Sequence, residues 1–353
     1  MNNLDKQYID LIKDILNNGR EKSDRTGTGT ISVFDRTIRH KMSEGFPLIT
    51  TKKVFFRGVV EELLWFLRGE QTALSLIKNN VHIWDGDLYK KYVEIQTRQK
   101  KNNSNIEILD KETFINIIQN KSEEPGYIGF ANRWSYVGPI YGTQWRKWEG
   151  HEDQISNLLW DLKTNPDSRR LIVSAWNPAE IGGMILPPCH YTFQCYTFEL
   201  TKEERYNLLP DKIKSMHDYC KTLKDFSLDK LLEIHTIPER YLSLKFIMRS
   251  NDLCLGLPFN LASYGLLLEI LAKEVNMIPY ELIANIGDCH IYKNQIEPIQ
   301  EQLSREGYEL PTLEIISKNG KNTLDGDISE YKYSDFKLIN YKSDNAIKIP
   351  LSN

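Results

Sequence analysis

The fold is decided by two stretches of sequence, HYTFQCYTFEL at residues 190–200 and YLSLKFIM at residues 241–248. The first is rich in Thr, Tyr and Phe, and the second begins with strict alternation of apolar and polar residues. Both features favour β-strands. We predict that the two stretches pair as an antiparallel hairpin whose connection has been expanded by the residues between them.

Three further stretches complete the predicted body of the protein. Residues 171–176, LIVSAW, are a third strand candidate. Residues 59–67, VVEELLWFL, predict a helix that is apolar on most of its circumference and hence largely buried. Residues 261–275, LASYGLLLEILAKEV, predict another core helix. Together these elements indicate an α+β fold with a mixed or mainly antiparallel sheet covered by helices.

Two stretches differ in composition from this body and are predicted to be surface insertions. Residues 92–132 are polar and rich in Asn and Lys, and residues 201–240 are heavily charged, with apolar residues at helix-like spacing. The chain shows no internal repeat and no Pro-, Gly- and Ser-rich linker long enough to separate domains. We therefore expect residues 1–353 to form a single domain from which both insertions extend.

Composition and charge argue against several classes of protein. The 353 residues are 41% hydrophobic and 26% charged, as in ordinary soluble globular proteins. A formal net charge of -3 provides no global cationic field for nucleic acid. The longest apolar stretch, residues 253–268, is broken by Pro258, Asn260 and Ser263, so no membrane span is predicted. Residues 1–16 predict an amphipathic helix with acidic residues and no cleavage site, so no signal peptide is expected.

The cysteines indicate a reducing compartment. Their number is odd and none belongs to a C-x-x-C pair, which argues against a disulfide framework and a structural zinc site. We therefore expect no metal and a cytoplasmic protein, in which most cysteines are small buried hydrophobic residues. The five are Cys189, Cys195, Cys220, Cys254 and Cys289.

Cys189 is the cysteine with a second interpretation. It follows two prolines in ILPPCHYTFQ and directly precedes a predicted strand, so a rigid backbone would present its thiol as a nucleophile. Only a few per cent of an ordinary thiol, with a pKa of about 8.5, is ionised at neutral pH unless positive charge lies nearby. His190 is not automatically its base, because neighbouring residues of a strand point to opposite faces. The alternative is a buried structural cysteine.

Arginines stand at three places where a phosphate could bind. Arg25 lies in the Gly/Thr loop DRTGTGT, Arg169 and Arg170 lie in DSRR at the predicted start of a strand, and Arg249 with Ser250 ends another strand. The planar guanidinium donates two parallel hydrogen bonds to phosphate. Taken singly, each arginine also fits a surface charge. In a strand Arg169 and Arg170 cannot face one pocket together, which suggests that one serves a neighbouring subunit.

Polar residues in apolar surroundings are further candidates. Glu61 and Glu62 lie in the apolar helix 59–67, where burial would raise a carboxyl pKa toward neutrality and suit it to proton transfer. Asn260 lies among apolar residues, either as a hydrogen-bond hub of the core or as a reader of a ligand edge. His290 and Tyr292, two residues apart, share one face if their segment is extended.

In this order, these stretches resemble the folate-dependent thymidylate synthase family, which also contains deoxypyrimidine hydroxymethylases. The resemblance runs from about Asp24 almost to the last residue and omits both insertions. So many ordered blocks make a chance resemblance negligible. The matching blocks are DRTGTGTISVF, FPLITTKKVFFRGVVEELLWFLRG, HIWD, GPIYGTQWR, DSRRLIVSAWNP, LPPCH, RSNDLCLGLPFNLASYG and GDCHIYKNQIEPIQEQLSRE.

The resemblance implies a reaction. Cys189 would attack carbon 6 of the uracil ring of dUMP, and carbon 5 would then take the methylene group of 5,10-methylenetetrahydrofolate. Loss of the carbon 5 proton expels tetrahydrofolate, which returns a hydride and leaves dTMP and dihydrofolate. Covalent catalysis thereby divides one difficult displacement into easier steps, with the folate as co-substrate.

The resemblance also implies how the nucleotide is held. Arg25, Arg249 and Ser250 of one chain would bind its phosphate together with Arg169 and Arg170 of the partner subunit. This implies a homodimer, with a face of the sheet at the interface. Within one chain, Asn260 would pair with the uracil edge. His290 with Tyr292 would hold the sugar hydroxyl.

The remaining roles concern proton transfer and the folate. The residues that resemble the proton-transfer network beside Cys189 are Glu62, Tyr141 and His190. A closing segment, residues 347–353 (IKIPLSN), resembles the tail that covers the bound pair and excludes water. The residues that would line the folate side are Trp84, Asp252, Leu255, Gly256 and Phe259.

Three departures from the family pattern stand out. Met248 replaces a common Gln beside the phosphate-binding Arg249, and Asp87 replaces a Trp or Asn on the folate side. The closing segment ends in Pro-Leu-Ser-Asn and is more polar than usual, which predicts looser closure.

Two alternatives to a synthase follow from the same residues. A dUMP 5-hydroxymethylase on the same fold would quench the exocyclic methylene with water instead of hydride. The cytosine-specific form carries Asp in place of the uracil-reading Asn, so Asn260 disfavours dCMP. A catalytically idle homologue that binds RNA or protein through its insertions is the alternative from another class, against which the net charge and the complete set of site residues argue.

Overall fold

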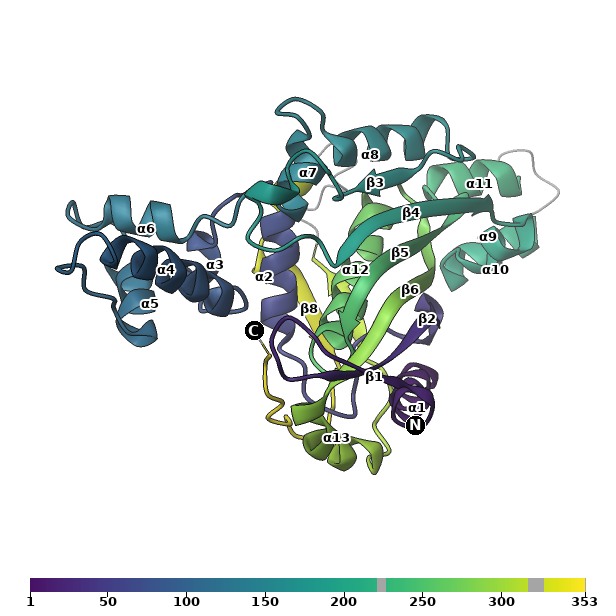
Figure 1. Ribbon diagram of the computed structural model, residues 1–353. Coiled ribbons are helices and arrows are strands. Elements are labelled where there is room, and N and C mark those ends of the chain that lie inside the picture. Colours follow the sequence, from purple (N-terminus) through teal and green to yellow (C-terminus); the bar gives the residue numbers. More distant parts are fainter. Residues whose placement is uncertain (221–226, 317–326, 353) are drawn as a thin grey trace.

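The computed structural model describes residues 1–220, 227–316 and 327–352, which are built around one six-stranded sheet (Figure 1). All neighbouring strands are antiparallel except β5 and β6, which are parallel. The sheet is therefore mixed, and the predicted α+β class is confirmed. In spatial order the strands are β1 (Arg20–Lys22), β2 (Thr30–Lys41), β6 (Ile278–Tyr292), β5 (Arg240–Asp252), β4 (His190–Glu199) and β3 (Ile172–Ser174).

The pairing of β4 with β5 confirms the predicted antiparallel hairpin. Its register places Phe193 opposite Phe246, and both rings are fully buried because they point to the same face of the sheet. The long connection between the two strands is helical where it is described, and residues 221–226 of the predicted insertion lie outside the described residues. Its helices are α9 (Lys202–Asn207), α10 (Asp211–Cys220) and α11 (Leu228–Ile234).

Helices bury one face of the sheet. α12 (Gly256–Glu274) packs on β5 and β6, and α2 (Phe56–Leu67) packs on α12. These are the two apolar helices that the sequence predicted. The other elements outside the sheet and the two insertions are α1 (Asn3–Asn18), η1 (Met42–Glu44), α3 (Leu74–Lys78), α7 (Tyr141–Lys147), α8 (Gln154–Thr164), η2 (Ile181–Gly183), η4 (Lys293–Gln295), α13 (Ile296–Leu303), β7 (Thr312–Ile315), η6 (Ile328–Glu330), η7 (Tyr333–Asp335) and β8 (Phe336–Ile339).

The opposite face of the sheet carries large exposed apolar side chains. Phe34 of β2 is 76% exposed, Tyr196 of β4 is 66% exposed and Ile172 of β3 is 50% exposed. A cavity of about 610 Å³ on this face is lined by Phe34, Trp176, Tyr191 and Ile247, among others. A contiguous apolar surface of this kind is typical of an interaction face.

Residues 92–132 have more structure than their polar composition predicted. They belong to α4 (Asp85–Lys100), α5 (Lys111–Asn120) and α6 (Ile128–Trp134), which extend to one side of α2 (Figure 1). Tyr92 packs on Phe114 and Trp134, with ring centroids 4.8 and 4.9 Å away. Three aromatic residues far apart in sequence therefore supply apolar packing that the Asn- and Lys-rich composition conceals.

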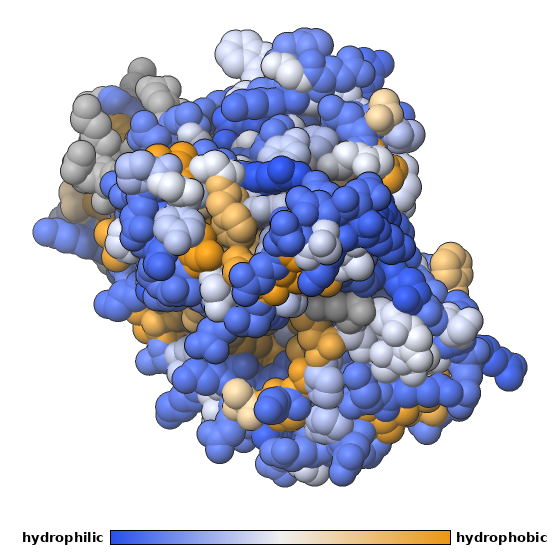
Figure 2. Space-filling view, turned by 60° about the vertical axis from the view of Figure 1, so that its left-hand side comes forward, coloured by the Kyte–Doolittle hydropathy of each residue, from blue (hydrophilic) through white to orange (hydrophobic). Residues whose placement is uncertain are grey.

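Seen from the side of these three helices, the surface is mostly hydrophilic, and hydrophobic residues are visible in hollows between hydrophilic ones (Figure 2). Among the described residues, no helix has the length and apolar character that a membrane crossing requires.

Candidate active site

The site is built around Cys189, which directly precedes β4. Its backbone N–H donates a hydrogen bond of 2.8 Å to the Tyr141 hydroxyl of α7, and its carbonyl accepts one of 2.9 Å from the Arg249 N–H of β5. Both backbone groups of the predicted nucleophile are thus fixed from neighbouring elements. The predicted rigid presentation of the thiol has a physical basis beyond the two prolines.

The Arg249 side chain holds the segment before Cys189. Its Nε and Nη2 atoms donate hydrogen bonds of 2.9 Å to the carbonyls of Pro188 and Pro187. The same Nη2 lies 3.8 Å from the Cys189 Sγ atom. One guanidinium therefore positions the loop and brings positive charge to the thiol.

Burial and positive charge act on this thiol in opposite directions. Burial raises the pKa of Cys189 above its ordinary value, Arg249 and Arg25 lower it in part, and Asp87 raises it further. The expectation that the arginines of the site favour the thiolate is right in sign. Within one chain, however, burial outweighs them, because desolvation disfavours the charged form.

His190 points to the buried side of the sheet, as its position next to Cys189 on a strand predicted. Its Nδ1 atom forms a 2.9 Å hydrogen bond with the Tyr264 hydroxyl, and its ring stacks on Tyr141 with centroids 4.1 Å apart. Burial lowers the pKa of His190 to about 3. The imidazole is therefore neutral near pH 7, and its ring packs against that of Tyr141.

The structure distinguishes the two carboxylates of α2. Glu61 pairs with Arg57, 3.8 Å away and one helical turn earlier. Glu62 accepts a hydrogen bond of 3.0 Å from the Trp84 indole nitrogen, and burial raises its pKa to about 7. A pKa near 7 suits the Glu62 carboxyl to proton transfer near neutral pH.

The register of the sheet brings the nucleotide candidates together. The ends of β5 and β6 lie side by side, with Ser250 opposite Asp288 and Asp252 opposite His290. His290 and Tyr292 share one face as predicted, with ring centroids 5.2 Å apart.

The Arg25 loop is placed by the same sheet, because Thr30 directly after it pairs with Tyr292. Asp24 holds the loop by accepting hydrogen bonds from the backbone N–H groups of Thr26, at 2.9 Å, and Gly29, at 2.8 Å. Gly29 has a φ of 80°, a left-handed conformation that favours glycine. Arg25 lowers the pKa values of both Cys189 and Asp87, which places its charge at the site.

Asn260 has a neighbour that sequence analysis missed. The Asn251 Nδ2 atom donates a hydrogen bond of 3.1 Å to the Asn260 Oδ1 atom and lies 3.4 Å from the Met248 Sδ atom. The unusual methionine is thus a buried acceptor for Asn251. The sequence signal was the polar run Arg-Ser-Asn-Asp at the end of a strand, in which Asn251 was the one residue that sequence analysis had not named.

Four of the predicted folate residues, Asp252, Leu255, Gly256 and Phe259, lie at or just before the start of α12, whereas Trp84 lies directly before α4. Asp252 accepts hydrogen bonds from the backbone N–H groups of Cys254, at 3.0 Å, and Leu255, at 3.1 Å. Gly256 begins α12, and Phe259 is partly buried against the core. Gln295, also missed at the sequence level, donates to the second oxygen of Asp252 at 2.9 Å.

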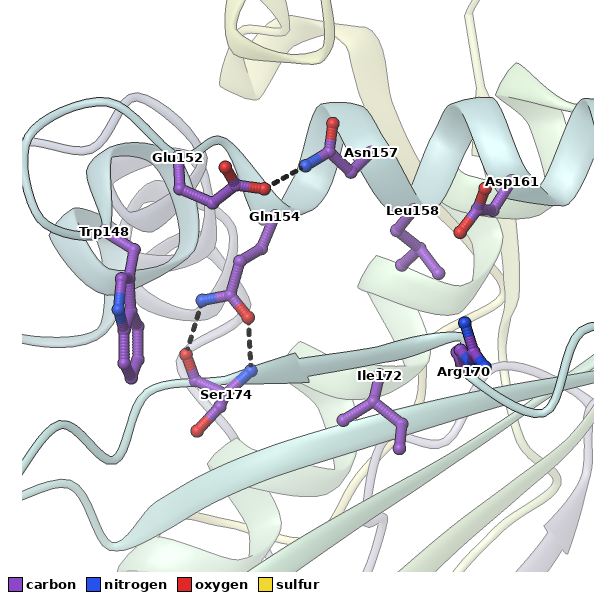
Figure 3. Close-up of a pocket in the computed structure, with 9 residues that line it drawn as sticks. All are labelled: Trp148, Glu152, Gln154, Asn157, Leu158, Asp161, Arg170, Ile172 and Ser174. Carbon is purple, nitrogen blue, oxygen red and sulfur yellow. Dashed lines mark hydrogen bonds between the residues drawn. The ribbon is translucent and has the colours of Figure 1, made fainter.

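Arg169 and Arg170 are not brought to this site within one chain. They lie in an exposed turn before β3 and not in a strand as predicted. Because Ile172 pairs with Gln194, the two arginines lie along β4 some seven residues from Cys189, which at ~3.3 Å per residue is roughly 20 Å. Arg170 instead lines a pocket of about 380 Å³ between α8 and β3 (Figure 3).

Hydrogen bonds beside this pocket join α8 to β3. The Gln154 amide pairs with the backbone of Ser174 through two hydrogen bonds, of 2.8 and 2.9 Å, which fix α8 to β3 (Figure 3). Among the described residues, no group of three or more His, Cys, Asp or Glu side chains is placed to hold a metal ion.

Comparisons with known proteins agree in one family. The family model described as "Thymidylate synthase" matches residues 6–353. A thymidylate synthase of Listeria monocytogenes serotype 4b (strain CLIP80459) is 37% identical over 358 residues, which cover 98% of this chain and 99% of the relative. A thymidylate synthase of Mesoplasma florum is 37% identical over 338 residues, or 96% of each chain.

Glu62→Gln tests the environment of the buried carboxyl. With a pKa of about 7 in the folded protein against an ordinary 4.5, Glu62 is ionised in the unfolded chain between these pH values and takes up a proton on folding. The stability that its neutral form contributes is therefore lost as pH rises through this window. We expect the variant to gain about 3 kcal/mol in free energy of unfolding relative to wild type between about pH 4.5 and 8, measured by urea unfolding.

The matched control is Glu61→Gln, which removes the neighbouring carboxylate that pairs with Arg57 at 3.8 Å. We expect its stability relative to wild type to change by less than about 1 kcal/mol over the same pH range. A pH-independent difference between Glu62→Gln and wild type would show that Glu62 is solvated like an ordinary carboxylate.

Proposed function

The chain belongs to the thymidylate synthase family, whose members are methyltransferases, and from that premise we propose that it converts dUMP to dTMP. The donor of both the carbon and the hydride is 5,10-methylenetetrahydrofolate, and dihydrofolate is the second product. The observation that carries this proposal is the placement of Cys189, with its backbone fixed from two sides and its sulfur 3.8 Å from the Arg249 guanidinium.

Cys189 acts as the nucleophile. Its sulfur bonds to carbon 6 of the uracil ring, which makes carbon 5 nucleophilic toward the methylene group. Loss of the carbon 5 proton then breaks the bond between the methylene group and the folate nitrogen, and tetrahydrofolate is released from the adduct. Tetrahydrofolate gives a hydride to the exocyclic methylene, which becomes a methyl group while the sulfur–carbon bond breaks and frees the Cys189 thiolate. Because burial raises the pKa of the Cys189 thiol, the thiolate depends on Arg249, on Arg25 and on the arginines that the partner adds.

Glu62 moves protons during this sequence. A pKa of about 7 lets its carboxyl both hold and release a proton at neutral pH. The Trp84 indole N–H fixes one carboxyl oxygen, so the orientation of the group is preserved in either state. Tyr141, whose hydroxyl accepts from the Cys189 N–H, connects this side of the site to the nucleophile.

Three groups of residues read the nucleotide. Arg25, Arg249 and Ser250 bind the phosphate, His290 with Tyr292 holds the sugar hydroxyl, and Asn260 pairs with the uracil edge. The sheet register supports this division, because the start of β2 lies beside the end of β6, which in turn lies beside the end of β5. Each hydrogen bond to a charged group contributes about 1.5–3 kcal/mol.

The enzyme acts as a homodimer through the uncovered face of the sheet. Phe34, Tyr196 and Ile172 are exposed there, and an interface would remove their apolar surface from water. Arg169 and Arg170 lie roughly 20 Å from Cys189 of their own chain along β4, too far for their side chains to span. We infer that both bind the phosphate held by the partner.

Cys189→Ala tests the nucleophile. We expect a loss of turnover of at least about 10⁴-fold with nucleotide binding largely intact, because no covalent bond to carbon 6 can form. Dihydrofolate is followed by absorbance, and the adduct with 5-fluoro-dUMP and the folate is followed by mass spectrometry. Cys195→Ala, which removes a buried thiol from the same strand, is the control and should keep the adduct.

Two results would overturn parts of this proposal. Tetrahydrofolate in place of dihydrofolate as the product of wild type would indicate hydroxymethylation. Absence of a 5-fluoro-dUMP adduct on wild type would remove the covalent role of Cys189 and favour a catalytically idle homologue.

Asn260→Asp tests the base reader. Cytosine presents an amino group and an unprotonated ring nitrogen where uracil presents an oxygen and an N–H, so the substitution leaves polar groups of uracil unpaired. We expect kcat/KM for dUMP to fall at least about 100-fold relative to that for dCMP. Unchanged selectivity would identify Asn260 as a hydrogen-bond hub of the core.

Mixing two inactive variants tests the shared site. A Cys189→Ala chain still offers its arginines, and an Arg169→Ala/Arg170→Ala chain still offers its cysteine. After an equal mixture is allowed to exchange subunits, half of the dimers are hybrids with one complete site each, so activity should recover to about a quarter of wild type. No recovery, despite hybrid dimers visible by native mass spectrometry, would place the arginines outside the partner's site.

A further inference from the structure

Gln295 is a fully buried amide at the end of η4, with its hydrogen-bonding groups engaged on three sides. Its Nε2 atom donates to the Asp252 Oδ2 atom at 2.9 Å and to the Pro350 carbonyl at 3.1 Å. Its Oε1 atom accepts from the Tyr292 N–H at 3.3 Å. One side chain thus joins the end of β5, the end of β6 and the closing segment 347–352.

Each of these three partners belongs to a different part of the proposed site. Tyr292 lies on the sugar side, Asp252 lies on the folate side, and Pro350 lies in the segment expected to cover both. We propose that Gln295 is a positioning residue for the folate: it fixes the Asp252 carboxylate and docks segment 347–352 beside it. The inference rests on the proposed function, because the folate is the ligand assigned there. The contacts of Gln295 are independent of that assignment.

The chemistry of the three contacts requires a neutral amide. A carboxylate oxygen and a carbonyl both accept, so the group between them needs two N–H donors, while the Tyr292 N–H needs an acceptor on the other side. Among uncharged side chains only Gln and Asn provide this combination, and Asn is one methylene shorter. A carboxylate at position 295 would face Asp252 with like charge and could donate a hydrogen bond to neither Asp252 nor Pro350.

The orientation of Asp252 depends on this contact. One of its oxygens accepts from the backbone N–H groups of Cys254, at 3.0 Å, and Leu255, at 3.1 Å. The other oxygen accepts from Gln295. Removing the amide takes away the side-chain donor to this oxygen and frees the partly buried carboxyl group to rotate about its remaining contacts.

A second polar contact holds the same segment. Asn294, the neighbour of Gln295, lies 3.2 Å from the Ser352 Oγ atom through its Nδ2 atom. Ser352 is buried, whereas Leu351 beside it is 61% exposed. Ile349 adds partial apolar packing. The unusually polar ending, which predicted loose closure, is thus held by hydrogen bonds from η4.

The first measurement concerns docking and needs no substrate. Lys348 is exposed, and trypsin must extend the chain on both sides of Lys348 to cut after it. In Gln295→Met, which keeps the length of the side chain and removes its hydrogen bonds, we expect this cleavage to be about tenfold faster by intact-mass spectrometry. Gln302→Met is the matched control, because Gln302 is also fully buried but donates to Thr51 at 2.9 Å; its cleavage rate should equal that of wild type.

The second measurement separates positioning from general destabilisation. For Gln295→Met we expect KM for the folate to rise about tenfold and KM for dUMP to change less than twofold. The factor by which kcat falls should be smaller than the factor by which KM for the folate rises. A parallel rise of both KM values, or the same changes in Gln302→Met, would reduce Gln295 to a structural anchor and overturn the inference. Unchanged cleavage after Lys348 in Gln295→Met would overturn it as well.

If Gln295→Met does not fold, Asn294→Ala provides a second test of whether η4 docks the closing segment. Asn294 is exposed, so its removal spares the core, and we expect cleavage after Lys348 to be about threefold faster; no change would contradict docking by η4. If wild type forms no dTMP, the proposed function fails, while the cleavage rates still decide whether the amide holds the segment.

Discussion

The site depends on the hydrogen bonds between the Arg249 guanidinium and the carbonyls of Pro187 and Pro188. Two successive prolines have no N–H groups, so their segment cannot join the β4–β5 ladder as a donor. Arg249 supplies donors from the opposite strand and thereby extends the pairing of β5 beyond the first residue of β4. Because Nε and Nη2 are used in this way, Nη1 is the donor left for an anion. Structural support and phosphate binding are therefore compatible in one side chain.

Burial divides the acid–base roles behind the nucleophile. The pKa of Glu62 rises to about 7 and that of His190 falls to about 3, both chiefly through desolvation. Each group is therefore largely uncharged over part of the neutral range, but only the carboxyl can exchange a proton there. The imidazole contributes packing and a hydrogen bond to Tyr264. The environment, and not the residue type, thus supports the proposed role of Glu62 in proton transfer.

Local patterns predicted the parts of the fold that depend on neighbours in sequence. The β4–β5 hairpin, α2 and α12 could each be predicted from the pattern of apolar residues. Alternation in the strands and a continuous apolar circumference in the helices directly reflect which side chains are buried. The parallel pairing of β5 with β6 has no such signal, since it depends on how α12, which connects the two strands, packs on them. Tyr92, Phe114 and Trp134 meet from three helices, so no window of sequence contains their contact. Likewise, the resemblance named Asp252, but only the fold revealed Gln295 as its partner.

The departures from the family pattern become interpretable through their partners. Met248 is buried, and its sulfur accepts a hydrogen bond from the Asn251 amide. The same amide donates a second hydrogen bond to Asn260. Asn251 thus connects the position of this departure to the residue proposed to read the base. Asp87, in the first turn of α4, opposes Arg25 in its effect on the Cys189 thiol. Since burial also raises the pKa of Asp87 itself, its effect on the thiol weakens as it gains a proton, and the arginines then act on Cys189 with less opposition.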